Sequence, residues 1–216
     1  MKLLLAAATE AEIGSTLEAL ASAPDTSVEV TPCITGVGLT AATFALTRAL
    51  CTDRYDFVIQ AGIGGAFDRS IALGTVALVE RETFGDLGAE DNDGFLTVFD
   101  LGFEDQDRHP FQNGSLINPL SSIPFDVSDL PRISSLTVHT VSGIAHTVSE
   151  RASHYGASLE SMEGAALHFV CLSLGIPFLQ LRAVSNYVEP RNRAAWQVKP
   201  AIAALNAQLQ QWLLPR

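Results

Sequence analysis

Apolar and polar positions alternate along the chain in blocks that are typical of an α/β protein. Short apolar runs of the kind found in buried strands are separated by segments with helical spacing. The pattern predicts strands at residues 3–8, 28–34, 57–61, 75–84, 136–141 and a last one ending at 181–186. Helices are expected at residues 9–20 and around 167–172. One helix is opened by residues 36–41 and runs to about residue 50, another begins at residue 147, and a last one lies at the C-terminal end. With 216 residues, one α/β domain spanning residues 1–216 is the expected organisation.

The composition argues against several partners. The net charge of −11 gives an anionic surface, which repels nucleic-acid phosphates and anionic lipids. Cys33, Cys51 and Cys171 lie far apart without a CxxC motif, so we expect small core residues, no metal site and no disulfide. The first apolar run is too short for a signal peptide, and no run is long enough to span a membrane. A cytoplasmic protein is therefore expected.

Two interpretations compete for Glu12, which follows the first predicted strand. Thr9 and Glu12 form a T-x-x-E capping box, in which each side chain satisfies a free backbone N–H at a helix start. The same turn lies at the carboxyl edge of the predicted sheet, where α/β proteins place their ligand sites. Glu12 is thus a candidate both for a structural cap and for a functional residue.

Two glycine-rich segments follow strands. Residues 36–41 fit the dinucleotide fingerprint G-x-G-x-x-A, which keeps a nicotinamide-dependent oxidoreductase open as an alternative. The acid at the expected spacing, Asp56, begins a strand instead of ending one, which spoils that match. Gly62, Ile63 and Gly64 are expected to form a loop whose backbone lets a ligand approach closely.

The C-terminal third carries the most specific motifs. Residues 160–166 read Glu-Ser-Met-Glu-Gly-Ala-Ala and lead into an apolar helix, and residues 182–186 read Arg-Ala-Val-Ser-Asn at the end of a strand. Together these segments resemble the nucleoside phosphorylase and nucleosidase superfamily, and the resemblance extends over most of the chain. It implies a three-layer α/β/α sandwich around a central mixed sheet, a homo-oligomer of two or more subunits, a small-molecule nucleoside substrate and no cofactor.

The resemblance also implies roles for particular residues. Glu12 would activate the attacking water, Glu163 would hold ribose hydroxyls and Asn186 would contact the purine. The substrate-binding candidates are Gly62, Ile63, Gly64, His146, Thr147, Ser161, Met162, Arg191 and Arg193. The two arginines would suit a carboxylate on the 5′ side of the substrate, although a solvated basic loop remains the alternative. His146, where related nucleosidases have an aromatic residue, could equally be structural.

Asn186 bears on the choice of base. Adenine-specific members of the superfamily have an aspartate at this place, whereas an asparagine amide offers two N–H donors that match N7 and O6 of a 6-oxopurine. Asparagine also reads adenine through N6 and N7, so this residue alone leaves the base open.

The nucleophile is the second choice that the sequence addresses. A phosphorylase needs cationic donors for phosphate, and the acidic turn at Glu10 and Glu12 has no Arg or Lys nearby in sequence. Hydrolysis is therefore favoured, with a nucleoside phosphorylase or a methylthioadenosine-type nucleosidase as the alternatives.

Overall fold

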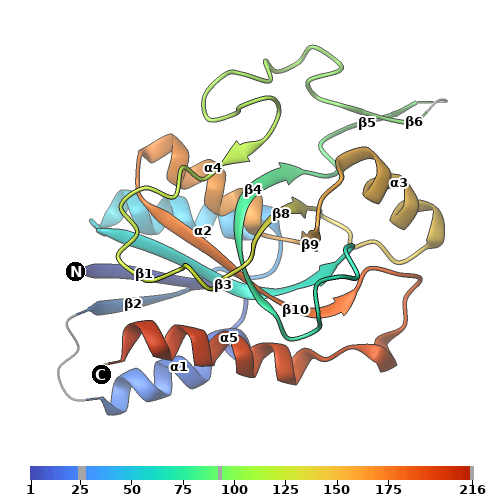
Figure 1. Cartoon of the computed structure of the whole chain (residues 1–216). Helices are drawn as coiled ribbons and strands as arrows, with labels where there is room; N and C mark the ends of the chain where they lie inside the picture. Colours follow the sequence, from blue (N-terminus) through green and yellow to red (C-terminus); the bar gives the residue numbers. More distant parts are fainter. Residues whose placement is uncertain (24–27, 92–93, 215–216) are drawn as a thin grey trace.

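The computed structural model describes residues 1–23, 28–91 and 94–214 (Figure 1). The strands are β1 (Lys2–Ala7), β2 (Glu29–Ile34), β3 (Phe57–Ala66), β4 (Val76–Phe84), β5 (Gly88–Asp91), β6 (Gly94–Thr97), β7 (Leu116–Ile117), β8 (Arg132–Thr137), β9 (Leu159–Ser161) and β10 (Phe178–Tyr187). The helices are α1 (Glu10–Ser22), α2 (Leu39–Thr52), α3 (Ala145–Tyr155), α4 (Gly164–Leu174), the short 3-10 helix η1 (Arg193–Ala195) and α5 (Val198–Leu213).

One eight-stranded mixed sheet organises the fold. Its strand order is β10-β4-β8-β9-β3-β1-β2, and β7 adds to β4. β3 pairs in parallel with both β1 and β10, and it also pairs antiparallel with β9. Because β10 also pairs with β4, the strands β3, β10, β4, β8 and β9 close into a ring. β3 therefore lies at the junction of the open part of the sheet and the closed part.

Helices cover both faces of the open part, as Figure 1 shows. α1 and α5 pack on one face, where Ile13, Leu205 and Leu209 join the buried side chains of β1, β3 and β10. α2 and α4 pack on the other face, where Leu46 and Leu167 meet Leu4 and Val58. The predicted three-layer sandwich around a mixed sheet is confirmed. None of the described helices has the length and apolar character needed to cross a membrane.

Several local predictions were wrong. Gly62, Ile63 and Gly64 form the second half of β3 instead of a loop, because they pair with residues 182–184 of β10. Gly64 has a packing reason to lack a side chain, since a Cβ there would lie 2.6 Å from a methyl group of Leu159.

Other boundaries also differ from the pattern. β8 ends at Thr137, so the expected strand at 136–141 is mostly a connecting segment. α3 begins at Ala145, two residues before the expected start, which places Thr147 inside the helix. Residues 88–91 and 94–97 form the paired strands β5 and β6, which the pattern did not predict. Cys171 is buried as predicted, whereas Cys51 is exposed on α2.

Candidate active site

Glu12 is held at both oxygens of its carboxylate. The Thr9 backbone N–H and hydroxyl donate to Oε2 at 2.9 and 3.0 Å, so the predicted capping box forms. The Ile63 backbone N–H donates to Oε1 at 3.1 Å. The side chain therefore caps α1 and at the same time reaches β3, with only 7% of its surface exposed. The two interpretations of Glu12 are compatible with one conformation.

Glu163 lies at the start of α4, on the same side of the sheet junction. It is the N-cap residue of the helix and is buried. The Gly38 backbone N–H donates to its Oε1 at 3.0 Å. Its Oε2 accepts a hydrogen bond from Arg182 Nη1 at 3.4 Å. Glu163 thus joins the start of α2, the start of α4 and the middle of β10.

Arg182 bonds one of the two carboxylates and lies near the other, and the sequence analysis gave it no role. Its side chain is 2% exposed and also donates to the Ile63 carbonyl and to Gln60 Oε1, both at 3.3 Å. A Cβ added to Gly62 would lie 2.4 Å from Arg182 Nη1 and 3.0 Å from Glu12 Oε1, so both side chains border Gly62. A charged residue inside an otherwise apolar strand was the available signal, because buried charges need partners.

This arginine corrects one argument from the sequence. No cation directly follows the first strand along the chain, but the fold places the Arg182 guanidinium beside Gly62, which Glu12 also borders, from 170 positions away. The absence of a nearby cation therefore cannot separate a hydrolase from a phosphorylase. Because Arg182 already bonds Glu163, Gln60 and the Ile63 carbonyl, most of its donors are engaged.

The G-x-G-x-x-A segment, residues 36–41, contributes a hydrogen bond to the Glu163 carboxylate. Gly38 has a φ of 94°, which favours glycine, and it presents its N–H to Glu163. Asp56 precedes β3 and accepts a hydrogen bond from the Lys2 backbone at 2.7 Å, at the amino end of both strands. Since a ribose-binding acid belongs at a strand's carboxyl end, the dinucleotide interpretation is wrong.

Asn186 lies further along β10, at a register shift next to Gly65. The Ser185 hydroxyl donates to its Oδ1 at 2.8 Å, and its Nδ2 donates to the Tyr187 carbonyl at 3.0 Å. A purine that accepts both amide protons must therefore displace the bond to Tyr187. Asn186 and Arg191 line a cavity of about 60 Å³.

Glu160 borders the same cavity and was also missed by the sequence analysis. It accepts hydrogen bonds from the Ser142 backbone at 2.8 Å and from the Ser142 hydroxyl at 2.6 Å. Arg151 Nη1 approaches its carboxylate at 3.2 Å. These bonds fix Ser142 beside Asn186, so Glu160 holds part of the cavity wall in place.

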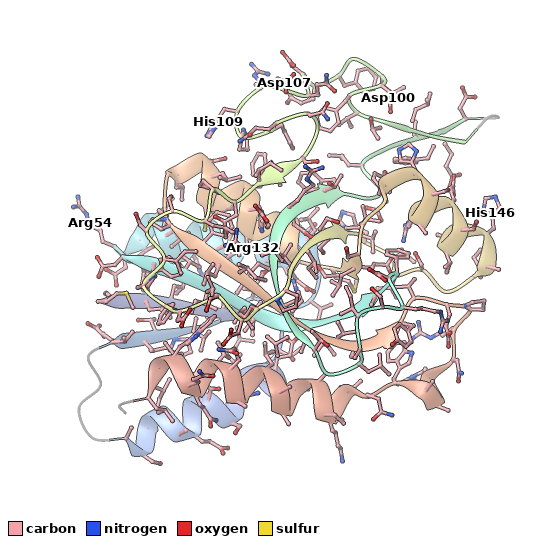
Figure 2. The ribbon with its side chains drawn as sticks, viewed as in Figure 1. Arg54, Asp100, Asp107, His109, Arg132 and His146 are labelled. Atoms are coloured by element: carbon pink, nitrogen blue, oxygen red, sulfur yellow. The ribbon has the colours of Figure 1, made fainter. Side chains whose placement is uncertain are left out.

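The other predicted residues are dispersed. Ser161 ends β9, is buried and precedes Met162 and Glu163 directly. His146 is 84% exposed at its side chain, and Figure 2 shows it at the outer end of α3, pointing away from the sheet. This position differs from the one expected for a purine contact, because the loop after β8 continues past Ser142 before α3 begins.

Two predicted binding residues border a larger cavity. Thr147 and Arg191 line a space of about 740 Å³ between α3 and the β5–β6 hairpin. The Arg191 guanidinium lies 5.4 Å from the centre of the Trp196 ring, and its backbone N–H donates to the Gly143 carbonyl. Arg193 is exposed in η1. The structure thus brings together Glu12, Gly62, Ile63 and Glu163, and it places Asn186 with Arg191 in an adjoining group.

A buried carboxyl group, Glu82, supports the start of α4. It is fully buried, and this burial raises its pKa from the ordinary 4.5 to about 7. The Thr137 hydroxyl lies 3.1 and 3.3 Å from its two oxygens and accepts a hydrogen bond from the Ala165 N–H at 2.8 Å. Gly164 packs against Glu82 because it has no Cβ, which would lie 2.6 Å from Glu82 Oε2. Glu82 therefore contacts the turn that carries Glu163.

Comparison with known proteins identifies the class to which this fold and site belong. Residues 22–212 match the phosphorylase superfamily, and the chain belongs to that superfamily. Curated relatives include the futalosine hydrolase of Streptomyces coelicolor, which is 41% identical over 70% of this chain and 62% of its own length. The futalosine hydrolase of Thermus thermophilus is 32% identical over 79% of this chain and 75% of its own length. The matched region thus spans less than two thirds of the Streptomyces protein.

Solved structures share the fold. A 5′-methylthioadenosine/S-adenosylhomocysteine nucleosidase from Neisseria meningitidis, in complex with methylthio-immucillin-A, superimposes with a TM-score of 0.76 at 17% identity over 96% of both chains. The futalosine hydrolase of Helicobacter pylori gives a TM-score of 0.73 at 16% identity, also over 96% of both chains. At these identities the similarity establishes the architecture.

Proposed function

We propose that this chain hydrolyses the N-glycosidic bond of futalosine, releasing hypoxanthine and dehypoxanthine futalosine in the futalosine route to menaquinone. The observation that carries the proposal is a pair of buried carboxylates at the sheet junction: Glu163 bonds Arg182, and Arg182 and Glu12 both border Gly62. Futalosine hydrolases from three organisms among the curated relatives support the choice of substrate.

Glu12 acts as the general base in this proposal. Its Oε1 takes a proton from water, the water oxygen bonds to C1′ of the ribose, and the bond from C1′ to the purine nitrogen breaks. The electron pair of that bond leaves with the purine, which takes up a proton. The hydrogen bonds from Thr9 and Ile63 fix the carboxylate in advance, and such orientation is what makes a positioned base effective.

Glu163 and Arg182 serve the sugar. Positive charge develops on the ribose as the bond to the purine breaks, and a carboxylate beside it stabilises that charge. Glu163 also accepts the hydrogen bonds that ribose hydroxyls donate. Arg182 contacts Glu163 directly, and its positive charge stabilises that carboxylate.

Asn186 and its surroundings would hold the base and the 5′ substituent. The Asn186 amide donates to the departing purine, while Gly64 in β3, Ser161 at the end of β9 and Met162 after it are the remaining candidates for contacts with the nucleoside. Arg191 offers a planar donor group to a carboxylate on the substrate. Thr147 lines the larger cavity together with Arg191, whereas His146 and Arg193 are exposed on α3 and in η1.

We also propose that the enzyme is a cytoplasmic homo-oligomer that needs no cofactor. Large apolar side chains are exposed at Val37, Phe44 and Phe103, of which Phe103 is 80% accessible. Exposed aromatic groups of this kind are enriched at subunit interfaces. Light scattering after size exclusion chromatography would give the subunit number.

The alternatives are a nucleoside phosphorylase and a methylthioadenosine-type nucleosidase. The second is favoured by a curated nucleosidase of Colwellia psychrerythraea that is 26% identical over 80% of this chain. Incubation with futalosine, inosine and methylthioadenosine, each with and without phosphate, separates the three by chromatography of the released base. Phosphate-independent release of hypoxanthine from futalosine is expected. Turnover that requires phosphate, or that is faster with methylthioadenosine, would refute the proposal.

A further inference from the structure

Asn206 is a polar residue in the interface between the first and last helices, α1 and α5. α5 packs on α1 through Leu205 and Leu209, which join the core around Ile13. Asn206 lies on the same side of α5 and is 3% exposed. An amide in such an interface costs free energy unless its hydrogen bonds are satisfied.

The Asn206 amide is fully satisfied. Its Oδ1 accepts from the Thr16 backbone N–H at 2.9 Å and from the Thr16 hydroxyl at 2.7 Å. Its Nδ2 donates to the Glu12 carbonyl and to the Ile202 carbonyl, both at 2.8 Å. These bonds use both donors and both acceptor lone pairs of an asparagine side chain. The amide orientation follows from its partners, because the two carbonyls only accept and the N–H only donates.

The two backbone partners of Asn206 in α1 are the Glu12 carbonyl and the Thr16 N–H. In a regular α-helix the carbonyl of residue 12 accepts from the N–H of residue 16. Asn206 bonds both of these groups, so an amide from the other end of the chain bridges one turn of α1 at Glu12. A side chain placed at this step of the helical ladder sets the local direction of the helix.

We propose that Asn206 is a positioning residue that fixes the backbone of Glu12, and hence the carboxylate that activates water. This inference rests on the proposed function of Glu12. The carboxylate is tied to Thr9 and Ile63, and the carbonyl of the same residue is tied to Asn206. Glu12 is thereby held at its side chain by β3 and at its backbone by α5. A displacement of about 1 Å at a reacting group can cost a hundredfold in rate.

The chain offers a matched control one turn further along α5. Gln210 donates to the Ser15 carbonyl at 3.2 Å and to the Ser15 hydroxyl at 3.3 Å, so it also bonds α5 to α1 but does not touch Glu12. Asn206→Leu keeps the branched shape of the side chain but has no hydrogen-bonding group, and Asn206→Ala removes the side chain. We expect kcat for futalosine to fall about 10- to 100-fold in both variants, with KM changed less than about threefold. Gln210→Ala should retain kcat.

Combination with Glu12→Gln separates positioning from general weakening. If Asn206 acts through the carboxylate, Asn206→Leu should lower the residual rate of Glu12→Gln by less than about threefold, because residues that act as a unit are not additive. The same loss in both backgrounds would overturn the proposal. So would a folded Asn206→Leu variant with the kcat of the Gln210→Ala control.

A measurement without substrate tests the bridge itself. Amide hydrogen exchange at Thr16 should be faster in Asn206→Ala than in Gln210→Ala, since only the first change removes the Asn206 oxygen from that N–H and with it the bridge from this turn of α1 to α5. Equal exchange would overturn the bridge. The wild-type protein in the same assay tests the proposed function separately: no release of hypoxanthine refutes that function, whereas normal release with an unaffected Asn206→Leu refutes only the positioning role.

Discussion

Glu82 should make the protein less stable as the pH rises from 5 to 8, and Glu82→Gln should remove most of that loss. Burial raises the pKa of this carboxyl group to about 7 in the folded protein, from its ordinary 4.5. Between these two values the folded state binds a proton that the unfolded state has released. The folded state is therefore most stable below the pKa of the unfolded state, and it loses stability as the pH rises through the pKa of the folded state.

The size of the effect follows from the two pKa values. One unit of pKa corresponds to about 1.4 kcal/mol, so full ionisation of Glu82 costs about 3 kcal/mol of the free energy of unfolding. Most of this cost, about 2 to 3 kcal/mol, falls between pH 5 and pH 8. Such a change is a large part of the typical stability of a domain. The nearby Arg182 lowers the pKa and Glu163 raises it, and the burial effect exceeds both.

Urea unfolding of the wild type and of Glu82→Gln at pH 5, 6, 7 and 8, at constant ionic strength, measures this difference. A glutamine can accept the hydrogen bond from Thr137 but cannot ionise, so the advantage of the variant should grow with pH. Glu90→Gln on the exposed strand β5 is the control and should follow the wild type. Parallel stability profiles of Glu82→Gln and the wild type would show that Glu82 does not titrate in this range and would refute the reasoning.

Three further predictions concern the proposed reaction. Glu12→Gln should lower kcat for futalosine by about 10²- to 10⁴-fold while the Tm stays close to that of the wild type, because glutamine still closes the capping box; near-normal turnover would leave Glu12 only its structural role. Asn186→Asp should lower kcat/KM for futalosine relative to its 6-amino analogue by more than about tenfold, since an ionised carboxylate opposes two purine acceptors; an unchanged ratio would mean that Asn186 does not contact the six-position. Arg191→Ala should raise KM for futalosine more than Arg193→Ala does, because Arg191 borders the cavity of Asn186 whereas Arg193 lies two residues further on in η1; equal and unchanged KM values would leave both arginines without a role in binding.

Local patterns predicted much of the fold. The apolar runs gave the positions of β1 and β4 closely, because a buried strand needs consecutive apolar residues whatever its neighbours are. Thr9 and Glu12 predicted their own capping box, since the interaction spans a single helical turn. The predicted superfamily is confirmed by the match over residues 22–212. The roles of Glu12, Glu163 and Asn186 stay predictions that the assays above address.

Local patterns failed where a distant segment decides the outcome. Gly62 to Gly64 resemble a turn, but pairing with β10 makes them strand, and the lack of a Cβ at Gly62 makes room for Arg182. Glu12 and Arg182 both border Gly62, although 170 positions separate them and no spacing rule connects them. Asn206 looks like a polar interruption of an apolar helix until α5 is placed against α1.

The sequence by itself therefore determined the elements, the class of fold and the kinds of residue available for chemistry. Each of these depends on neighbours within a few positions, where backbone geometry fixes which side chains meet. Only the tertiary structure decided which charges are paired, at which glycine another side chain approaches the backbone closely, and which amide holds the backbone of Glu12. Those contacts depend on how β3, β10, α1 and α5 come together, and burial gives them energetic weight because a buried charge or amide must find its partners.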